Sequence, residues 1–221
     1  MSTPLVEAYE RLLARYGPQS WWPGQSPFEI MVGAVLVQNT NWRNVERAID
    51  NLREEGLLSP ATLYATSEAD LEELIRPAGY FRVKTKRLRN LLAWLHERYD
   101  GSLEQMFASS LSTLREELLT VSGIGPETAD SILLYAGGLP TFVVDAYSHR
   151  VLFRHGWIDA EADYYRIQEV FLDQLPQDAS LYNEYHALLV RVGKEHCKPT
   201  PICEGCPLCD MLPPGGPLRP E

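Results

Sequence analysis

Helical periodicity runs through almost the whole chain, and it constrains the fold more than any other feature. Within residues 85–99, for example, Leu88, Leu91, Leu92 and Leu95 recur at the spacing of one helix face. Comparable patterns predict further helices at residues 28–37, 42–54, 112–121, 126–135, 164–174 and 182–195. The β-branched run at 141–144 is too short to build a sheet. The sequence therefore predicts an all-α fold.

Local start signals support several of these helices. Asn39 and Thr40 are good N-cap residues for the helix at 42–54, because a side-chain oxygen there can accept from a free backbone N–H. Ser59 and Ser67 are expected to open two shorter helices.

The length and composition allow a substantial core. A chain of 221 residues, 45% of them apolar, can form one large domain or two small ones. No stretch of about 18 uncharged apolar residues occurs in the sequence, so no membrane-spanning helix is expected. Residues 1–18 mix charged and apolar residues, which indicates an amphipathic helix rather than a signal peptide. We therefore expect a cytoplasmic protein.

The net charge of −10 argues at first against a nucleic-acid partner, because phosphates are bound by Lys and Arg. Binding depends on the local field, however, and seven of the 20 basic residues lie within residues 76–98. This basic segment is either a solvated helix face or a surface for nucleic acid.

All four cysteines lie close to the end of the chain, at Cys197, Cys203, Cys206 and Cys209. Disulfide bonds of a secreted protein usually connect cysteines that are scattered along the chain. A single cluster in a cytosolic chain points instead to one metal site. Four thiolates can hold either a [4Fe–4S] cluster or a zinc ion.

Two apolar helices are expected to meet at Gly123-Ile124-Gly125. Glycine permits a tight turn and leaves backbone amides uncovered, and amides at the start of a helix can bind a phosphate oxygen. The alternative is an ordinary helix–helix turn. Asp145 follows 20 residues after Gly125, behind an apolar run that predicts partial burial; it is either a functional carboxylate or only a helix N-cap.

Four motifs together resemble the endonuclease III superfamily of helix-hairpin-helix (HhH-GPD) DNA glycosylases. The similarity extends from about residue 25 to residue 209, with the motifs in the family's order. They are Val37-Gln38-Asn39-Thr40, Gly123-Ile124-Gly125, Val144-Asp145-Ala146-Tyr147-Ser148-His149-Arg150, and Gly193-Lys194 with the cysteines that follow. Trp21-Trp22-Pro23 together with Gln38 to Trp42 resembles the branch that includes 3-methyladenine DNA glycosylase III.

The resemblance implies a two-lobed helical protein around a DNA groove. One lobe would be a helical barrel with the hairpin, at residues 24–135. The other would combine residues 1–23 with residues 136–221 and carry the cluster. The implied partner is duplex DNA with a damaged, and in this branch alkylated, base; the implied reaction is hydrolysis of the base–sugar bond by a monomer.

The resemblance also assigns roles to single residues. Asp145 matches the catalytic aspartate, which stabilises positive charge on the deoxyribose. Gln38 matches the residue that fills the space of a flipped-out base, and the amides of Gly123 and Gly125 would bind a phosphate. Lys84 and Lys86 fall in a stretch similar to the family's Gly-Tyr-x-x-Lys segment, and are expected near DNA.

Trp42 is expected to line the base pocket, because a cationic alkylpurine stacks well on an electron-rich ring. The alternative is a core tryptophan, and Trp21 and Trp22 are expected to serve in packing.

Glu127 stands where bifunctional members of the superfamily carry a lysine. That lysine forms a Schiff base with the sugar and leads to strand cleavage. A carboxylate cannot form a Schiff base, so the sequence predicts a monofunctional glycosylase with weak or absent lyase activity. Lys194 is the residue that could supply an amine instead.

For the cofactor, the family implies a [4Fe–4S] cluster on Cys197, Cys203, Cys206 and Cys209, with zinc as the alternative. The spacing of x5, x2 and x2 differs from the more usual x6, x2 and x5.

Three other functions remain compatible with the sequence. The first is a bifunctional glycosylase and lyase for oxidised pyrimidines. The second is a DNA-binding module without catalysis. The third is a zinc-stabilised helical protein with no DNA partner.

Overall fold

The computed structural model describes residues 3–19, 21–22 and 24–219, and these residues form helices and turns without a β-strand. The expected all-α fold is thereby confirmed. The chain divides into two compact units, which we call the central unit (Trp22–Leu139) and the terminal unit (Met1–Trp21 with Pro140–Glu221). The lobe boundaries expected from the sequence, near residues 23 and 136, remain a proposal, and Pro23 lies outside the described residues.

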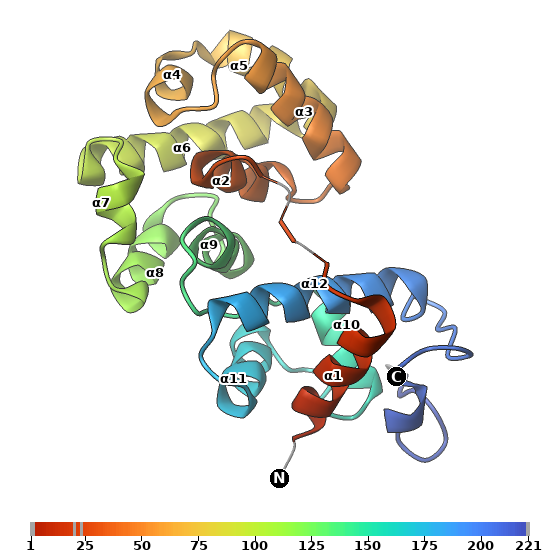
Figure 1. Ribbon diagram of the computed structural model, residues 1–221. Coiled ribbons are helices and arrows are strands. Elements are labelled where there is room, and N and C mark those ends of the chain that lie inside the picture. The colour runs from red at the N-terminus through yellow and green to blue at the C-terminus, as the bar shows by residue number, and fades with distance from the viewer. Residues whose placement is uncertain (1–2, 20, 23, 220–221) are drawn as a thin grey trace. The chain divides into compact units, whose positions relative to one another are not determined.

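The central unit is built around α2. This helix contacts α3, α6, α9 and η2, and these neighbours surround it in Figure 1. Eight of its ten residues are buried, as expected for a segment that is apolar on nearly every face. The elements of the unit are α2 (Pro27–Leu36), α3 (Trp42–Glu54), α4 (Pro60–Ala65), α5 (Glu68–Leu74), η1 (Arg76–Ala78), α6 (Phe81–Tyr99), α7 (Leu103–Phe107), α8 (Leu111–Thr120), α9 (Pro126–Ser131) and η2 (Ile132–Ala136).

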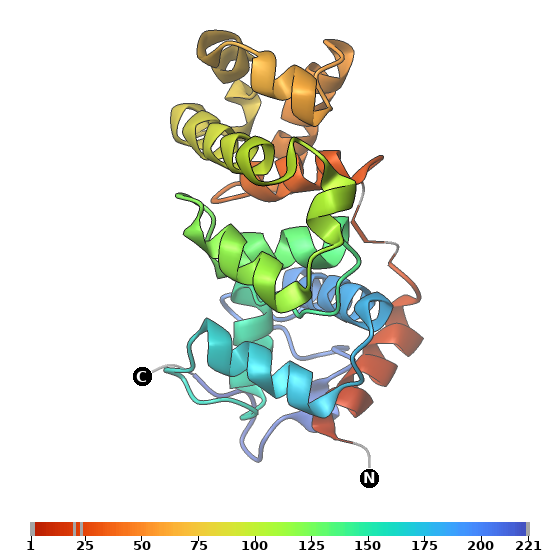
Figure 2. The same ribbon diagram turned by 90° about the vertical axis from the view of Figure 1, so that its left-hand side faces the viewer.

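The long helix α6 lies between α2 and the two short helices α4 and α5. It packs on α4 and α5 with one side and on α2 with another, and the orange α4 and α5 lie above the yellow α6 in Figure 2. The buried stripe of α6 contains the leucines that the periodicity placed there, Leu88, Leu91, Leu92 and Leu95.

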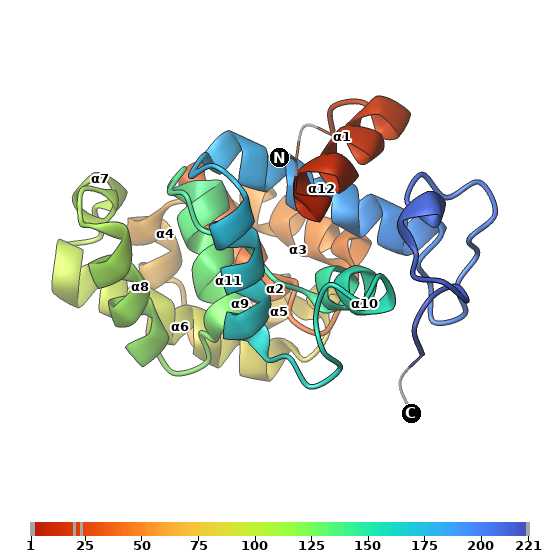
Figure 3. The ribbon, with the colours of Figure 1, turned by 90° about the horizontal axis from the view of Figure 1, so that it is seen from below.

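The terminal unit is centred on α12 (Ala179–Glu195), which packs against α10 (Ala146–Arg154) and α1 (Pro4–Tyr16). The unit is completed by α11 (Tyr164–Gln174) and by the short turn η3 (Cys209–Met211). Figure 3 shows the segment that contains the cysteines, in dark blue, looping beyond the end of α12. None of the helices within the described ranges combines the length and hydrophobicity of a membrane span.

The helices expected at 42–54 and 164–174 have those bounds in the structure. The N-cap of α3 is Asn41, however, and not Asn39 or Thr40, because Asn39 adopts a left-handed φ of 54°. Helix α6 begins four residues before the expected position 85, after a left-handed Tyr80 without a side-chain cap. Helix α12 begins three residues before position 182, because Asp178 caps it.

Candidate functional site

The hairpin turn lies between α8 and α9, and only glycine fits at its centre. Gly123 has a φ of +97°, and a Cβ built on it would lie 2.3 Å from Cγ of Arg87. Gly125 has an ordinary φ of −93°, and a Cβ there would meet nothing within 4 Å. The two glycines therefore differ: the first is required by packing, and the second leaves the start of α9 open.

A buried ion pair joins the two hairpin helices. Arg115 of α8 donates from Nε to Oδ1 of Asp130 at 2.8 Å and from Nη2 to Oδ2 at 2.9 Å. Asp130 is completely buried. This two-point contact fixes α8 against α9 and so holds the turn in place.

Gln38 is hydrogen-bonded to this hairpin. Its Nε2 donates to Thr128 Oγ1 at 2.8 Å and to the carbonyl of Gly123 at 3.2 Å, while its Oε1 accepts from Arg87. Asn90 donates to the carbonyl of Ser122 at 2.9 Å. The structure thus brings Gln38, Gly123 and Gly125 together in one region of the central unit.

The expectation that the Lys84 side chain lies near DNA is wrong, because this side chain is buried. The side chain is 1% exposed, and Nζ donates to the carbonyls of Leu36 at 2.8 Å and Ala78 at 2.7 Å. The ammonium group therefore caps the end of α2 and cannot reach a phosphate. Lys86, two residues later, is exposed on the opposite side of α6.

Much of the remaining basic segment makes contacts within the protein. Arg76 pairs with Glu73 and Arg98 pairs with Glu117. Of the two interpretations of this basic segment, a solvated helix face therefore fits Arg76 and Arg98, whose charges are paired within the protein. Tyr80, the tyrosine of the Gly-Tyr-x-x-Lys stretch, is 71% exposed at the start of α6 with a left-handed φ of 46°.

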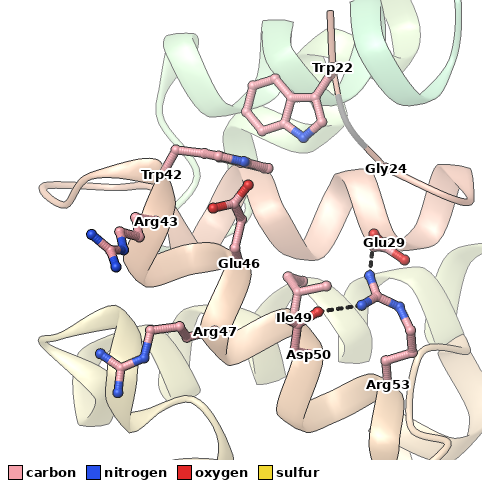
Figure 4. A pocket seen from close by; sticks show the side chains of 10 residues that line it. All are labelled: Trp22, Gly24, Glu29, Trp42, Arg43, Glu46, Arg47, Ile49, Asp50 and Arg53. Atoms are coloured by element: carbon pink, nitrogen blue, oxygen red, sulfur yellow. Dashed lines mark hydrogen bonds and ion pairs between the residues drawn. The ribbon is translucent and has the colours of Figure 1, made fainter.

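Trp42 begins α3 and lines a cavity of about 390 Å³, drawn in Figure 4. Trp22 stands edge-on to it, with ring centroids 4.8 Å apart and an interplanar angle of 82°. Trp22 also packs on Tyr135, again with centroids 4.8 Å apart. Both indoles fit above Gly33, where a Cβ would lie 3.5 Å from Trp42 and 3.6 Å from Trp22. The indoles of Trp22 and Trp42 therefore form one wall of the cavity.

The charged side chains that line this cavity differ in their ion pairs and in the direction in which they point. Arg53 is paired with Glu29 at 3.0 Å and with Asp50 at 2.5 Å. Figure 4 shows the Glu46 carboxylate beneath the Trp42 indole, whereas the side chain of Arg43, which also lines the cavity, points away from the two indoles. The wall next to the indoles thus carries a carboxylate.

Glu127 lies in the first turn of α9 and is exposed. A carboxylate is favourable at this end of a helix because the backbone N–H groups there carry partial positive charge. This residue therefore has a sufficient structural reason to be acidic.

Asp145 is the N-cap of α10, as the structural interpretation of this residue expects. Its Oδ1 accepts from the backbone N–H of Tyr147 at 2.9 Å, from that of Ser148 at 2.8 Å, and from the Ser148 hydroxyl at 2.9 Å. Its Oδ2 lies 3.5 Å from Nε2 of His186, a residue of α12. Its side chain is 15% exposed.

The surroundings of Asp145 favour the ionised carboxylate. Burial by itself raises the pKa of this carboxyl, but His186 and the hydrogen bonds from Ser148 outweigh it and bring the pKa below its usual value. These surroundings therefore favour the carboxylate form of Asp145, which is held by donors from the first turn of α10 and faced by His186 of α12.

Lys194 is exposed on α12, and its Nζ lies 6.0 Å from the centre of the Trp21 ring. The preceding residue, Gly193, packs directly against Tyr147, since a Cβ there would lie 2.3 Å from that ring. This close contact holds α12 against the first turn of α10.

The four cysteines line one small cavity at the end of α12, together with apolar residues such as Val151, Val192 and Leu208. Two turns bring the last three together: the Cys206 N–H donates to the carbonyl of Cys203, and the Cys209 N–H donates to the carbonyl of Cys206. Cys209 thus lies with the others despite its short spacing.

Two arginines of α10 hold this cysteine loop. Arg154 is buried; it donates to Cys197 Sγ at 3.2 Å, to the Lys198 carbonyl at 2.6 Å and to the Pro199 carbonyl at 2.7 Å. Arg150 donates to the carbonyl of Cys197 at 2.5 Å. Donors to a cysteine sulfur are typical of the surroundings of iron–sulfur clusters.

The thiols affect one another. Burial, with smaller contributions from the charges of the other cysteines, raises the pKa of Cys206 to about 11, and the pKa of Cys203 is raised for the same reasons. A positively charged inorganic group bound to the four sulfur atoms would offset the repulsion between their negative charges. The residues therefore fit a four-thiolate site, although no three Cys, His, Asp or Glu side chains in the described ranges are grouped to hold one metal ion.

A family model for the HhH-GPD superfamily of base excision DNA repair proteins matches residues 32–177. The chain belongs to this superfamily. It is 47% identical over 206 residues to a candidate DNA repair glycosylase of Methanocaldococcus jannaschii, covering 92% of this chain and 93% of that protein. It is 31% identical over 181 residues to endonuclease III of Thermotoga maritima, covering 81% and 79% of the two chains.

Solved structures show the same fold. The 3-methyladenine DNA glycosylase of H. pylori, bound to 1,N6-ethenoadenine, superposes with a TM-score of 0.74 at 28% identity, over 87% of this chain and 98% of that one. An endonuclease III–DNA complex superposes with a TM-score of 0.79 at 24% identity, over 93% and 92%. The chain is thus an endonuclease III-like HhH-GPD DNA repair glycosylase.

Proposed function

We propose that this glycosylase is monofunctional: it hydrolyses the bond between a damaged base and its deoxyribose, and does not cleave the strand. The fixed carboxylate of Asp145 carries the base-release part of this proposal, and Glu127 at the position of the family's lysine carries the absence of strand cleavage. As the base departs, positive charge develops on the sugar, and a carboxylate held in place stabilises that charge without having to reorganise.

The central unit supplies the contacts to duplex DNA in this proposal. The amides of Gly123 and Gly125 would bind a backbone phosphate, and Lys86 would add charge. Gln38 would exchange its hydrogen bonds to Thr128 and Gly123 for contacts with the DNA bases. The exposed Tyr80 would stack on a base.

The favoured substrate is an alkylated purine. The cavity of about 390 Å³ next to Trp42 and Trp22 is large enough for a purine ring. Alkylation of a ring nitrogen makes the base cationic, which favours both an indole face and the carboxylate of Glu46. The structural relative from H. pylori carries a modified purine, 1,N6-ethenoadenine, and this supports the same substrate class here.

A lesion panel tests this substrate class. The duplexes would carry alkylated purines, oxidised pyrimidines, uracil, or thymine opposite guanine, each at one defined position. We expect release of alkylated purines, and a slower release by Trp42→Ala and Glu46→Gln. Release of oxidised pyrimidines alone would contradict the assignment.

Lyase activity is expected to be weak or absent because Glu127 stands at the position of the family's lysine. Borohydride reduces a Schiff base to a stable protein–DNA adduct, so trapping tests this point directly. Wild type should give no adduct, and Glu127→Lys is the gain-of-function control.

The second candidate function is that of a bifunctional enzyme that uses Lys194, which is exposed on the helix that carries His186. An adduct that disappears in Lys194→Ala would establish it.

We also propose that Cys197, Cys203, Cys206 and Cys209 hold a [4Fe–4S] cluster rather than zinc. Three observations support the cluster: the cavity that the cysteines line is apolar, Arg154 donates to Cys197 Sγ, and the chain belongs to the superfamily. Its contribution would be structural, because binding to thiolates orders the loop after α12. A yellow-brown protein with about four irons per chain is expected, and stoichiometric zinc without iron would contradict the proposal.

A further inference from the structure

His186 is a buried histidine that faces the proposed catalytic carboxylate. It lies on α12, and its side chain is only 5% exposed. Nε2 of His186 is 3.5 Å from Oδ2 of Asp145. No role followed for this residue from the sequence, because it occupies one position in an apolar stripe with Tyr182, Tyr185 and Leu189.

The two oxygens of Asp145 have different surroundings. Oδ1 accepts three hydrogen bonds from the first turn of α10, two from Ser148 and one from Tyr147. All three donors belong to the first turn of α10, and none of these hydrogen bonds reaches Oδ2. Oδ2 is the oxygen that faces α12, where the imidazole of His186 lies 3.5 Å from it.

The imidazole is itself held by aromatic packing. Its ring lies against Phe142, with centroids 6.5 Å apart at an angle of 75°. Phe142 is completely buried and stacks on Phe171, with centroids 3.7 Å apart. Since Phe142 is only three residues before Asp145, the same aromatic cluster supports both the imidazole and the segment that leads into the carboxylate.

We propose that His186 is a positioning residue for base release: its Nε2 holds Oδ2 from the side of α12 and so, together with the donors of α10, keeps the Asp145 carboxylate in one orientation toward the reacting sugar. This proposal rests on the proposed function. His186 need not touch the DNA, and it acts only through Asp145. Its influence on the charge state of Asp145, whose pKa it lowers, is consistent with this role.

Two substitutions separate positioning from packing. His186→Phe keeps a planar ring against Phe142 but removes the nitrogen that faces Oδ2. His186→Gln places an amide N–H at nearly the reach of Nε2 and should rescue the function. Tyr182→Phe is the packing control, because Tyr182 is one turn earlier on α12, is completely buried and also contacts Phe142.

The experiment measures single-turnover base release and duplex affinity separately, with thermal unfolding of each variant as a folding check. We expect His186→Phe to slow release by about 10- to 100-fold, as a small misplacement of a catalytic group does, with DNA affinity unchanged within about twofold. His186→Gln and Tyr182→Phe should stay within about threefold of wild type. In an Asp145→Asn background, His186→Phe should have no further effect.

The outcomes distinguish this inference from the function it rests on. Release by His186→Phe at the wild-type rate would overturn the role of His186 and leave the proposed function intact. An equal loss in His186→Gln and His186→Phe, or an additional loss in the Asp145→Asn background, would also overturn it. If wild type releases no base from any lesion, the proposed function itself fails, and the role of His186 fails with it.

Discussion

Arg87 and Gly123 are in such close contact that no side chain fits at position 123: a Cβ there would lie 2.3 Å from Cγ of Arg87. The φ of +97° adds backbone strain for any other residue. We therefore expect Gly123→Ala to lower the free energy of unfolding by about 1–3 kcal/mol. It should also weaken binding to duplex DNA, because Gln38 and Arg87 both depend on the geometry of this turn. Urea denaturation and a binding titration measure the two effects.

Gly125 is the matched control for this prediction. A Cβ there meets nothing within 4 Å, and φ is −93°. Gly125→Ala should change the unfolding free energy by less than about 0.5 kcal/mol, while its methyl group weakens DNA binding by partly covering the start of α9. An equal loss of stability in the two variants would show that the steric argument is wrong.

Lys84 and Lys86 are expected to affect different properties although they are two residues apart. Lys84→Met leaves the buried carbonyls of Leu36 and Ala78 without this donor, which should cost about 1–3 kcal/mol of stability and leave the salt dependence of DNA binding unchanged. Lys86→Met should leave stability unchanged and reduce the slope of log K against log salt by about one. Reversed behaviour of the two variants would contradict the buried position of Lys84.

The stability of the protein should depend on pH through Lys84. Burial, and to a smaller extent the charge of Arg87, lowers the pKa of Lys84 from its ordinary value of 10.5 to about 8. Between these pH values the unfolded chain keeps a proton that the folded protein has released, so the unfolding free energy rises with pH. Urea denaturation over this range should therefore show wild type gaining stability relative to Lys84→Met as the pH rises. A difference that stays constant with pH would contradict this.

Arg154 should control how firmly the cysteine loop is held. It donates to Cys197 Sγ and to the carbonyls of Lys198 and Pro199. Arg154→Gln is too short to make all three contacts, so we expect faster release of iron to a chelator, by about 10-fold, and faster proteolysis after α12. Absorbance of the bound metal and peptide mapping provide the readout. Glu204→Gln, an exposed change within the same loop, should behave like wild type.

The periodicity and capping rules predicted much of the fold. Helix α11 has the expected bounds because Asp163 provides a side-chain cap and an apolar stripe follows. Helix α6 was placed too late because it starts after a left-handed Tyr80, which no capping rule anticipates. Helix α7 was missed because five residues contain too little periodicity, although Ser102 caps it.

The candidate site was predicted unevenly, for physical reasons. Asp145 and the hairpin glycines follow from local chemistry, since a turn and a buried acid leave a signal in the sequence. Lys84 was misplaced, although its spacing of four residues from Leu88 puts it on the buried stripe of α6. His186 could not be found, because its proximity to Asp145 depends on the packing of α12 against α10 and not on any local pattern.

The central claim is that Asp145 drives base hydrolysis without strand cleavage, and one measurement tests it most directly. Single-turnover base release from a duplex with one alkylated purine would be followed for wild type and Asp145→Asn, with and without alkali. Asparagine is also a good N-cap, so the variant should fold. We predict strand breaks that appear only after alkali with wild type, and a release by Asp145→Asn slower by at least about 100-fold. Breaks without alkali, or release by Asp145→Asn at the wild-type rate, would contradict the account.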